Sequence, residues 1–207
     1  MDFETSPPAE IVSWARQEYG SGLVVTASFE DAVLVHAVAA VDPSIEVVLL
    51  DTQYLFAETH WYAQEISTRL RLNLRIEHPL VEPDNRWQYD TESCCDVRKV
   101  QPLARALQGR TAWITGIRRA DGPSRANAPI VSFDERRGVT KINPLATMSD
   151  DDFARYELEH NLLAHPLRER GYASIGCWPC TRPVAPGEDR RAGRWAGSVK
   201  TECGLHT

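Results

Sequence analysis

The first half of the chain alternates short apolar runs with longer segments of helical spacing. Runs rich in Val, Leu and Ile predict β-strands, the first two buried on both faces, at residues 23–27, 46–50, 72–77 and 111–115. Apolar positions at helical spacing predict helices at residues 31–41, 57–70 and 96–107. Pro102 should kink the third helix or start a second short one. Ser149, followed by three aspartates, predicts the N-cap of a later helix.

Alternation of apolar strands with helices predicts an α/β fold, a mostly parallel sheet with helices on both faces. Ligands of such sheets bind beyond the carboxyl ends of the strands. We therefore expect one pocket to be lined by the loops at residues 28–31, 51–54 and 116–119. Beyond Pro166 the chain is rich in Gly and Pro, which predicts loops stabilised by something other than a large core.

Composition and charge narrow the class of protein. The chain has 207 residues, 43% of them hydrophobic and 25% charged, as in a soluble domain, and no apolar run is long enough to span a membrane. Residues 1–8 are acidic and lack the plan of a secretory signal, which predicts a cytoplasmic protein. The net charge of −6 argues against nucleic-acid binding. Twenty of the 23 basic residues are Arg, which suits a small anionic ligand, although compositional bias explains most of this excess.

Five cysteines form two close pairs and one single site. Cys94 and Cys95 are adjacent, Cys177 and Cys180 are separated by two residues, and Cys203 stands near the end. In a cytoplasmic protein such pairs favour metal binding or redox chemistry over structural disulfides. A structural zinc site remains possible from the Cys-x-x-Cys spacing alone. The adjacent pair favours an iron–sulfur cluster, because separate iron atoms are easier for neighbouring thiolates to reach.

Two further residues have candidate chemistry. Lys99 follows Cys95 by about one helical turn and could place its charge near an anionic cluster or a bound substrate; a solvated surface lysine is the alternative. Cys203 on a mobile terminal segment could visit a pocket and then meet a second protein. Lys200 and His206 could raise its thiolate fraction. An inert exposed cysteine is the alternative reading.

Arginines cluster on two loops that we expect at the same pocket. A single arginine is more often structural than catalytic, but two groups together suit phosphate and sulfate oxygens. The groups are Arg118, Arg119 and Arg125, and Arg190, Arg191 and Arg194.

At this point the motifs resemble assimilatory adenylyl-sulfate reductases of the phosphoadenylyl-sulfate reductase family. The resemblance runs in order from about Ser28 to His206, and the two cysteine pairs together with the Glu-Cys-Gly-Leu-His segment are highly specific. The motifs are Cys94-Cys95-x-x-Arg98-Lys99-Val100 with Pro102-Leu103, Trp113-x-Thr115-Gly116-x-Arg118-Arg119, Lys141-Ile142-Asn143-Pro144-Leu145, Gly171-Tyr172-x-Ser174-Ile175-Gly176-Cys177-x-x-Cys180-Thr181, Gly193-Arg194-Trp195 and Lys200-Thr201-Glu202-Cys203-Gly204-Leu205-His206.

The resemblance implies an adenine-nucleotide fold of the ATP-pyrophosphatase type over residues 1–195 and a mobile C-terminal tail over residues 196–207. It implies that Cys203 attacks the sulfur of adenosine 5′-phosphosulfate, that AMP leaves, and that thioredoxin or a similar dithiol releases sulfite from the S-sulfocysteine. It also implies a homo-oligomer. The cofactor it implies is a 4Fe–4S cluster on Cys94, Cys95, Cys177 and Cys180.

The resemblance also assigns substrate contacts. Ser28 to Asp31 would form the phosphate loop, and Asp51 and Thr52 would contact the adenosine. The phosphosulfate would be held by Lys99, Arg125, Arg191 and Arg194. One departure is that Phe29 and Glu30 replace the glycines of the phosphate loop. This argues against ATP pyrophosphate chemistry, and the charge of Glu30 favours a substrate without a 3′-phosphate.

Three alternatives make different predictions. A reductase of 3′-phosphoadenosine 5′-phosphosulfate would generally lack the two cysteine pairs. An ATP-dependent adenylating enzyme would keep a Gly-rich loop. A zinc-stabilised nucleotide-binding protein without catalytic activity would leave Cys203 without a role.

Overall fold

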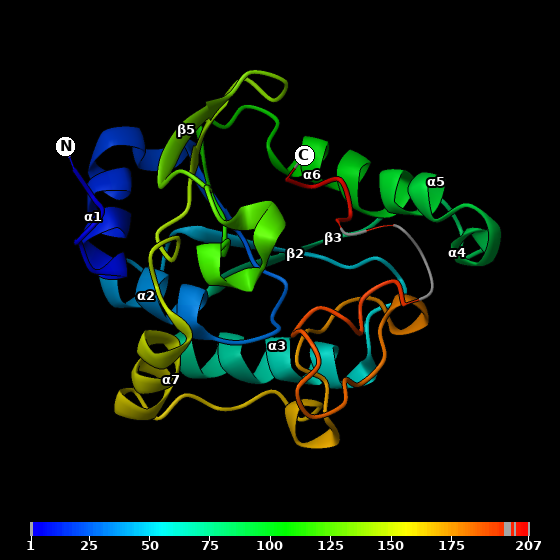
Figure 1. Ribbon diagram of the computed structural model, residues 1–207. Coiled ribbons are helices and arrows are strands. Elements are labelled where there is room, and N and C mark those ends of the chain that lie inside the picture. Colours follow the sequence, from blue (N-terminus) through cyan, green and yellow to red (C-terminus); the bar gives the residue numbers. More distant parts are fainter. Residues whose placement is uncertain (1, 197–199, 201, 207) are drawn as a thin grey trace.

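A six-stranded sheet forms the centre of the molecule in the computed structural model, which describes residues 2–196, 200 and 202–206 (Figure 1). The spatial order of its strands is β3-β2-β1-β4-β6-β5, and all neighbours pair in parallel except β5 and β6. The strands are β1 (Leu23–Thr26), β2 (Glu46–Leu50), β3 (Asn73–Glu77), β4 (Ala112–Ile114), β5 (Val131–Asp134) and β6 (Val139–Ile142).

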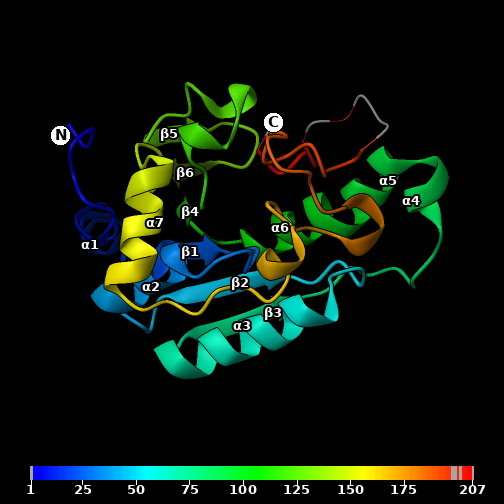
Figure 2. The same cartoon turned by 60° about the horizontal axis from the view of Figure 1, so that its bottom comes forward.

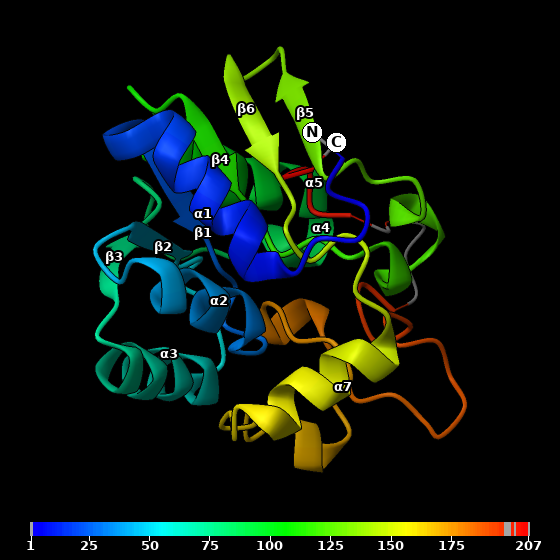
Figure 3. The same cartoon turned by 90° about the vertical axis from the view of Figure 1, so that its left-hand side faces the viewer.

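Seven α-helices lie around the sheet within the described part of the chain. They are α1 (Pro8–Tyr19), α2 (Val33–Val41), α3 (Ala57–Leu70), α4 (Arg86–Tyr89), α5 (Thr91–Cys95), α6 (Gln101–Ala106) and α7 (Asp150–Glu159). Successive strand residues point to opposite faces, so β1 buries Leu23 and Val25 on one face and Val24 on the other. Helices α1, α2, α3 and α7 cover the first face, and α6 covers the second (Figures 2 and 3). The predicted α/β fold with helices on both faces is confirmed.

The predicted elements match the observed ones closely. The strand over residues 46–50 and the helix over residues 57–70 have the predicted bounds, and the other three strands differ by a residue or less at each end. The helix over residues 31–41 begins two residues later, at Val33. Ser149 caps α7, because its hydroxyl accepts a hydrogen bond from the Asp152 N–H at 3.1 Å. The predicted N-cap is therefore confirmed.

Pro102 starts a new helix after an unusual turn. Residues 96–100 form a π-helical turn between α5 and α6, and Pro102 is in the first turn of α6. Proline has no N–H to donate and is tolerated there. The wider turn, a feature frequent at functional sites, joins Cys94 and Cys95 to Lys99.

The chain beyond Pro166 contains loops and short 3₁₀ turns, as predicted, at Arg168–Arg170 and Trp178–Cys180. An isolated β-bridge from Leu55 to Cys177 holds it near the carboxyl end of β2, and a second bridge, from Thr181 to Arg194, closes a loop within it. The sequence pattern missed α1 and the hairpin of β5 and β6, which lies at one edge of the sheet (Figure 3). No helix in the described residues is long and apolar enough to cross a bilayer.

Candidate active site

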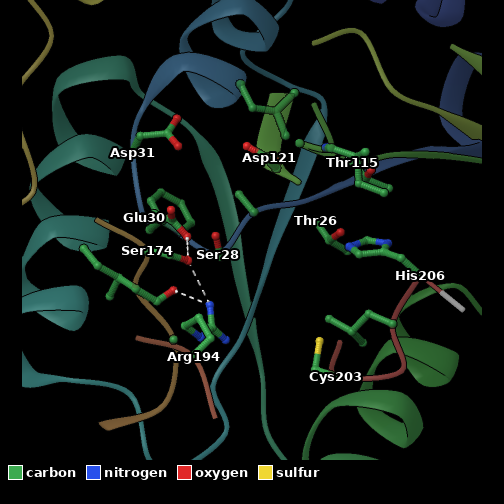
Figure 4. Close-up of a pocket in the computed structure, with 18 of the residues that line it drawn as sticks. Thr26, Ser28, Glu30, Asp31, Thr115, Asp121, Ser174, Arg194, Cys203 and His206 are labelled. Carbon is green, nitrogen blue, oxygen red and sulfur yellow. Dashed lines mark hydrogen bonds between the residues drawn. The ribbon is translucent and has the colours of Figure 1, made fainter. Parts of the chain in front are cut away.

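The loops after β1, β2 and β4 meet at one pocket, as the parallel topology predicts (Figure 4). The loop after β1 contributes Ser28 and Asp31, the loop after β2 contributes Thr52, and the loop after β4 contributes Arg118. The C-terminal segment completes the lining with Cys203. The structure therefore brings the nucleophile candidate to the ends of the strands.

The loop after β1 keeps a left-handed turn without glycine. Phe29 has a φ of 53° and is buried, in a region of backbone space that favours glycine. Glu30 pairs with Arg190 at 2.9 Å, and the charges of Arg190 and Arg194 outweigh burial and lower the pKa of its carboxyl. Burial, reinforced by the charge of Glu30, raises the pKa of Asp31 to about 6. Its carboxylate accepts the Val33 N–H at 2.9 Å and so caps α2.

The turn after β2 separates the two residues expected at the adenosine. Thr52 is buried and lines the pocket, and its Oγ1 lies 3.2 Å from Cys177 Sγ. Asp51 is not part of the pocket lining. Its carboxylate accepts the Gln53 N–H at 2.8 Å. Gln53 has a φ of 67°, in a region of backbone space that favours glycine. Asp51 therefore shapes the turn.

The arginines after β4 point in different directions. Arg118 lines the pocket but is only 2% exposed, pairs with Asp150 at 2.8 Å and lies over the Phe153 ring, so it joins this loop to α7. Arg119 is absent from the pocket lining and pairs with Glu4 at 2.7 Å. A 3₁₀ turn begins at Arg119, directly after the extended Arg118, and the two side chains reach different partners. The expectation that Arg119 contacts the substrate does not fit this placement, and the contacts of Arg118 are structural.

Arg194 lines the pocket, with its guanidinium close to the backbone of Gly176. A Cβ on Gly176 would lie 2.3 Å from its Nη2, so only glycine allows this approach. Its Nη1 donates to Ser174 Oγ at 3.2 Å, and its guanidinium lies 4.7 Å above the Trp195 ring. Its Nε is buried without a hydrogen-bond partner among the described residues. A buried unpaired cationic donor suits an anionic ligand, because leaving it unpaired is costly. Arg191 lies nearby, 6.0 Å from the same ring.

The four paired cysteines line a second cavity beside the first. Cys94, Cys95, Cys177 and Cys180 are all free thiols, and Lys99 lines both cavities. Burial raises the pKa of the Cys94 and Cys180 thiols and raises that of Cys95 to about 11. A metal group bound among them would favour their thiolate forms. Nowhere in the described chain do three ligating side chains converge on a single ion. Four thiols spread around one cavity suit a larger group.

Arg98 supports this cysteine cavity, and its role was missed from the sequence. It is 1% exposed, donates from Nη2 to the Glu82 carbonyl at 2.9 Å, pairs with Asp84 at 3.2 Å and lies 4.7 Å from the Tyr54 ring centre. Its place one turn after Cys94 was the available signal. Arg98 therefore ties the cysteine helix to the loop that precedes it.

The described part of the C-terminal segment is seated in the pocket. Leu205 packs on the face of the sheet covered by α6, and the His206 ring stacks on Trp113 at 5.6 Å. Burial opposes ionisation of the half-buried Cys203, but Lys99, the Leu205 N–H and Arg194 hold its thiol pKa below the ordinary value. The stacking of His206 was missed from the sequence. Within the predicted tail, residues 197–199, 201 and 207 lie outside the described residues.

Comparison with known proteins places the chain in a family. It is 43% identical over 221 residues to an adenosine 5′-phosphosulfate reductase of Rhodococcus opacus, covering 98% of this chain and 90% of the relative. It is 44% identical over 213 residues to a protein of the same name from Streptomyces coelicolor, covering 99% and 90%. A relative of that name from Mycolicibacterium smegmatis is 44% identical over 205 residues, covering 95% and 87%.

Solved structures share the fold. A phosphoadenylyl-sulfate reductase from Candida auris, solved as a phosphate complex, matches with a TM-score of 0.74 and 24% identity, covering 85% of this chain and 92% of that one. An FMN adenylyltransferase from Candida glabrata matches with a TM-score of 0.63 and 13% identity, covering 85% and 64%. The family described as "Phosphoadenosine phosphosulfate reductase domain" matches residues 22–183. The chain therefore belongs to the phosphoadenosine phosphosulfate reductase domain family.

Proposed function

We propose that this protein reduces adenosine 5′-phosphosulfate to sulfite and AMP, with Cys203 as nucleophile and thioredoxin or a similar dithiol as electron donor. The observation that carries the proposal is the position of Cys203 in the same pocket as the loop after β1, Lys99 and Arg194. The relatives named for this activity support the choice of substrate.

Two displacements at sulfur complete the reaction. The Cys203 thiolate forms a bond to the sulfur of the substrate, the bond from that sulfur to the bridging phosphate oxygen breaks, and AMP leaves with the electron pair. A thiolate of the donor then attacks Cys203 Sγ, and sulfite departs with the electron pair of the S–S bond. The second thiol of the donor resolves the mixed disulfide. Cys203 returns as a thiolate, and the donor is oxidised by two electrons.

The cations of the pocket hold the phosphosulfate in this proposal. Lys99 and Arg194 face Cys203 closely enough to lower its pKa, so a sulfuryl group bound to them lies beside the nucleophile. Arg191 adds a third cation on the same wall. Ser28 and Asp31 lie on the loop that would meet the 5′-phosphate, and Thr52 lies at the adenosine side.

Cys94, Cys95, Cys177 and Cys180 would hold a 4Fe–4S cluster. Their shared cavity and their free thiols support this assignment. When bound, the cluster contributes to the electric field around the phosphosulfate, while the thiols supply both electrons. Lys99 lies between this cavity and the substrate pocket and links the two electrostatically.

The remaining parts of the proposal follow from the family resemblance. Residues 1–195 form one domain, and residues 196–207 form a tail that leaves the pocket to meet the donor. The protein is cytoplasmic and assembles as a homo-oligomer. Reduction of the 3′-phosphorylated nucleotide is the second candidate, because the solved relative from Candida auris is named for that substrate.

Replacing the nucleophile tests the proposal. We expect Cys203→Ser to lower thioredoxin-dependent sulfite release by at least about 1,000-fold, because a hydroxyl is a far weaker nucleophile than a thiolate. Anaerobic protein is incubated with adenosine 5′-phosphosulfate, sulfite is assayed, and mass spectrometry detects the sulfonated peptide. Iron content and AMP affinity should stay at wild-type values. A Cys203→Ser protein that still released sulfite would disprove the nucleophile assignment.

A further inference from the structure

The guanidinium of Arg125 is committed to protein carboxylates. Its Nε and Nη2 donate to the two carboxylate oxygens of Glu202 at 2.9 and 3.0 Å, and its Nη1 donates to Asp121 at 3.1 Å. A two-point pair between guanidinium and carboxylate is among the stronger charged contacts. These three contacts engage three of the five N–H groups of the guanidinium. The phosphosulfate contact expected from the family resemblance stays a prediction.

Glu202 is held from three sides and immediately precedes the nucleophile. Ser124 Oγ donates to its Oε1 at 3.2 Å, and Arg191 Nη2 donates to its Oε2 at 3.3 Å. The Glu202 side chain is 12% exposed and that of Arg125 is 15% exposed, so water screens the pair poorly. Arg125 and Arg191 outweigh burial and lower the pKa of the Glu202 carboxyl. Fixing residue 202 in this way also fixes where Cys203 enters the pocket.

A second anchor follows the nucleophile and is apolar. Leu205 packs on the face covered by α6, and His206 stacks on Trp113. Cys203 therefore lies between an ion-paired anchor and an apolar one, in the pocket that Arg194 also lines (Figure 4). The charges of Lys99 and Arg194 act on its thiol. A reacting group held at both ends has fewer orientations to lose on reaching the transition state.

We infer that Arg125 and Glu202 form a clamp that closes the C-terminal segment over the pocket and positions Cys203 for attack. Both act as positioning residues for Cys203, because their pair fixes the residue that precedes it. The clamp gives the tail a release point that is distinct from the apolar anchor. The kinetic part of the inference rests on the proposed function, but the closure of the tail does not.

Two measurements on anaerobically purified full-length protein test the clamp. The first is the rate of tryptic release of residues 201–207. Cleavage after Lys200 requires this segment to open, because Lys200 Nζ lies 2.5 Å from Glu92 and the lysine side chain is buried in the closed form. We expect Glu202→Gln to speed release about tenfold, because the charged hydrogen bonds to Arg125 are weakened. Glu202→Asp keeps the charge on a shorter side chain. Its rate of tryptic release should lie between the rates of the wild type and Glu202→Gln.

The second measurement is the single-turnover rate of Cys203 sulfonation. We expect Glu202→Gln to slow it about tenfold with substrate affinity unchanged, because only the position of the thiol is disturbed. Removing the Glu202 charge also favours the thiolate, which alone would speed the reaction, so slower sulfonation cannot come from thiol ionisation. Glu188→Gln is the matched control, because Glu188 forms an exposed pair with Arg182 and lines neither cavity. Both of its rates should be those of the wild type.

The two measurements distinguish failure of the clamp from failure of the proposed function. Unchanged tryptic release in Glu202→Gln overturns the clamp. So does tighter binding of adenosine 5′-phosphosulfate without faster release, because Arg125 would then bind the substrate. If the wild type makes no sulfite but Glu202→Gln still opens faster, the proposed function is wrong while the clamp stands.

Discussion

Two walls of the active-site pocket are built in different ways. The sheet wall, made by Ser28, Thr52 and Thr115 at the strand ends, rests on a large apolar core between the sheet and α1, α2, α3 and α7. The cysteine wall consists of Cys94, Cys95, Cys177 and Cys180. Its apolar cluster contains little beyond Tyr54, Trp87 and the cysteines themselves.

The two walls obtain their stability from different sources. Burial of apolar area stabilises the sheet wall without any ligand. The cysteine wall buries thiols and an arginine, with few apolar side chains to offset the lost chain entropy. We therefore expect the cysteine wall to depend on the group that its thiols bind, as in small metal-stabilised domains.

Breaking each wall separately gives the largest expected effects. Cys177→Ser should lose iron and lower activity by at least about 1,000-fold while the far-ultraviolet circular dichroism of the sheet is retained, because a hydroxyl replaces a cluster ligand. Val47→Ala removes two methyl groups from a fully buried position of the core beneath the sheet wall and should lower the unfolding free energy by about 2 kcal/mol with iron retained. Iron assays and urea unfolding check both. Iron retained in Cys177→Ser would contradict the ligand role of Cys177, and iron lost in Val47→Ala would mean that the two walls are not independent.

A smaller effect is expected where the two walls meet. Arg194→Ala should lower kcat/KM about 100-fold, because a buried charged donor to the substrate is lost. Gly176→Ala should lower it about tenfold by pushing the guanidinium away, since the new Cβ overlaps Nη2. Both effects are read from initial rates of sulfite release.

A control separates this effect from damage to the neighbouring Cys177. The double variant of Gly176 and Arg194, both changed to Ala, should be no worse than Arg194→Ala alone, because the clash needs the arginine. Iron content equal to that of the wild type excludes loss of the cluster. Strictly additive losses would contradict the argument from close approach.

The sequence predicted the sheet wall better than the contacts within the pocket. Continuous apolar runs such as 46–50 indicate buried parallel strands directly, and the ends of such strands must share one edge. The gathering of the four paired cysteines was already favoured by their pairing, but the approach of Cys203 to a substrate beside them was expected only from family resemblance, because these residues are far apart along the chain. Spacing alone left a zinc site open.

Side-chain partners were the part that sequence could not supply. Arg118, Arg119 and Arg125 looked equivalent, yet Arg118 and Arg119 bind Asp150 and Glu4, and Arg125 binds Glu202. Which carboxylate an arginine meets depends on how distant segments pack, and no local pattern encodes that. The hairpin of β5 and β6 was missed because each strand has only four residues and none of the residues of β5 is fully buried.

The smallest expected effect is a change of unfolding free energy with pH, and we expect it to come from the sheet wall alone. His165 is fully buried beneath α3, with its Nδ1 accepting the Leu167 N–H at 3.1 Å and its Nε2 3.1 Å from Thr59 Oγ1. Burial, helped by Arg168, lowers the pKa of His165 to about 4, against 6.5 in the unfolded chain. Between these values only the unfolded chain takes up the proton. The stability that His165 contributes is therefore complete above pH 6.5 and is lost as the pH falls towards 4.

Comparing pH slopes isolates this contribution. From pH 7 to pH 5 we expect the wild type to lose about 2 kcal/mol more unfolding free energy than His165→Asn, which keeps an acceptor but cannot be protonated. Urea unfolding at both pH values measures the difference, and His78→Asn, at a side chain 59% exposed, is the control that should follow the wild type. Acid effects on the cysteine wall are common to all three proteins and cancel. Equal slopes in the wild type and His165→Asn would mean that the histidine does not couple the sheet wall to pH.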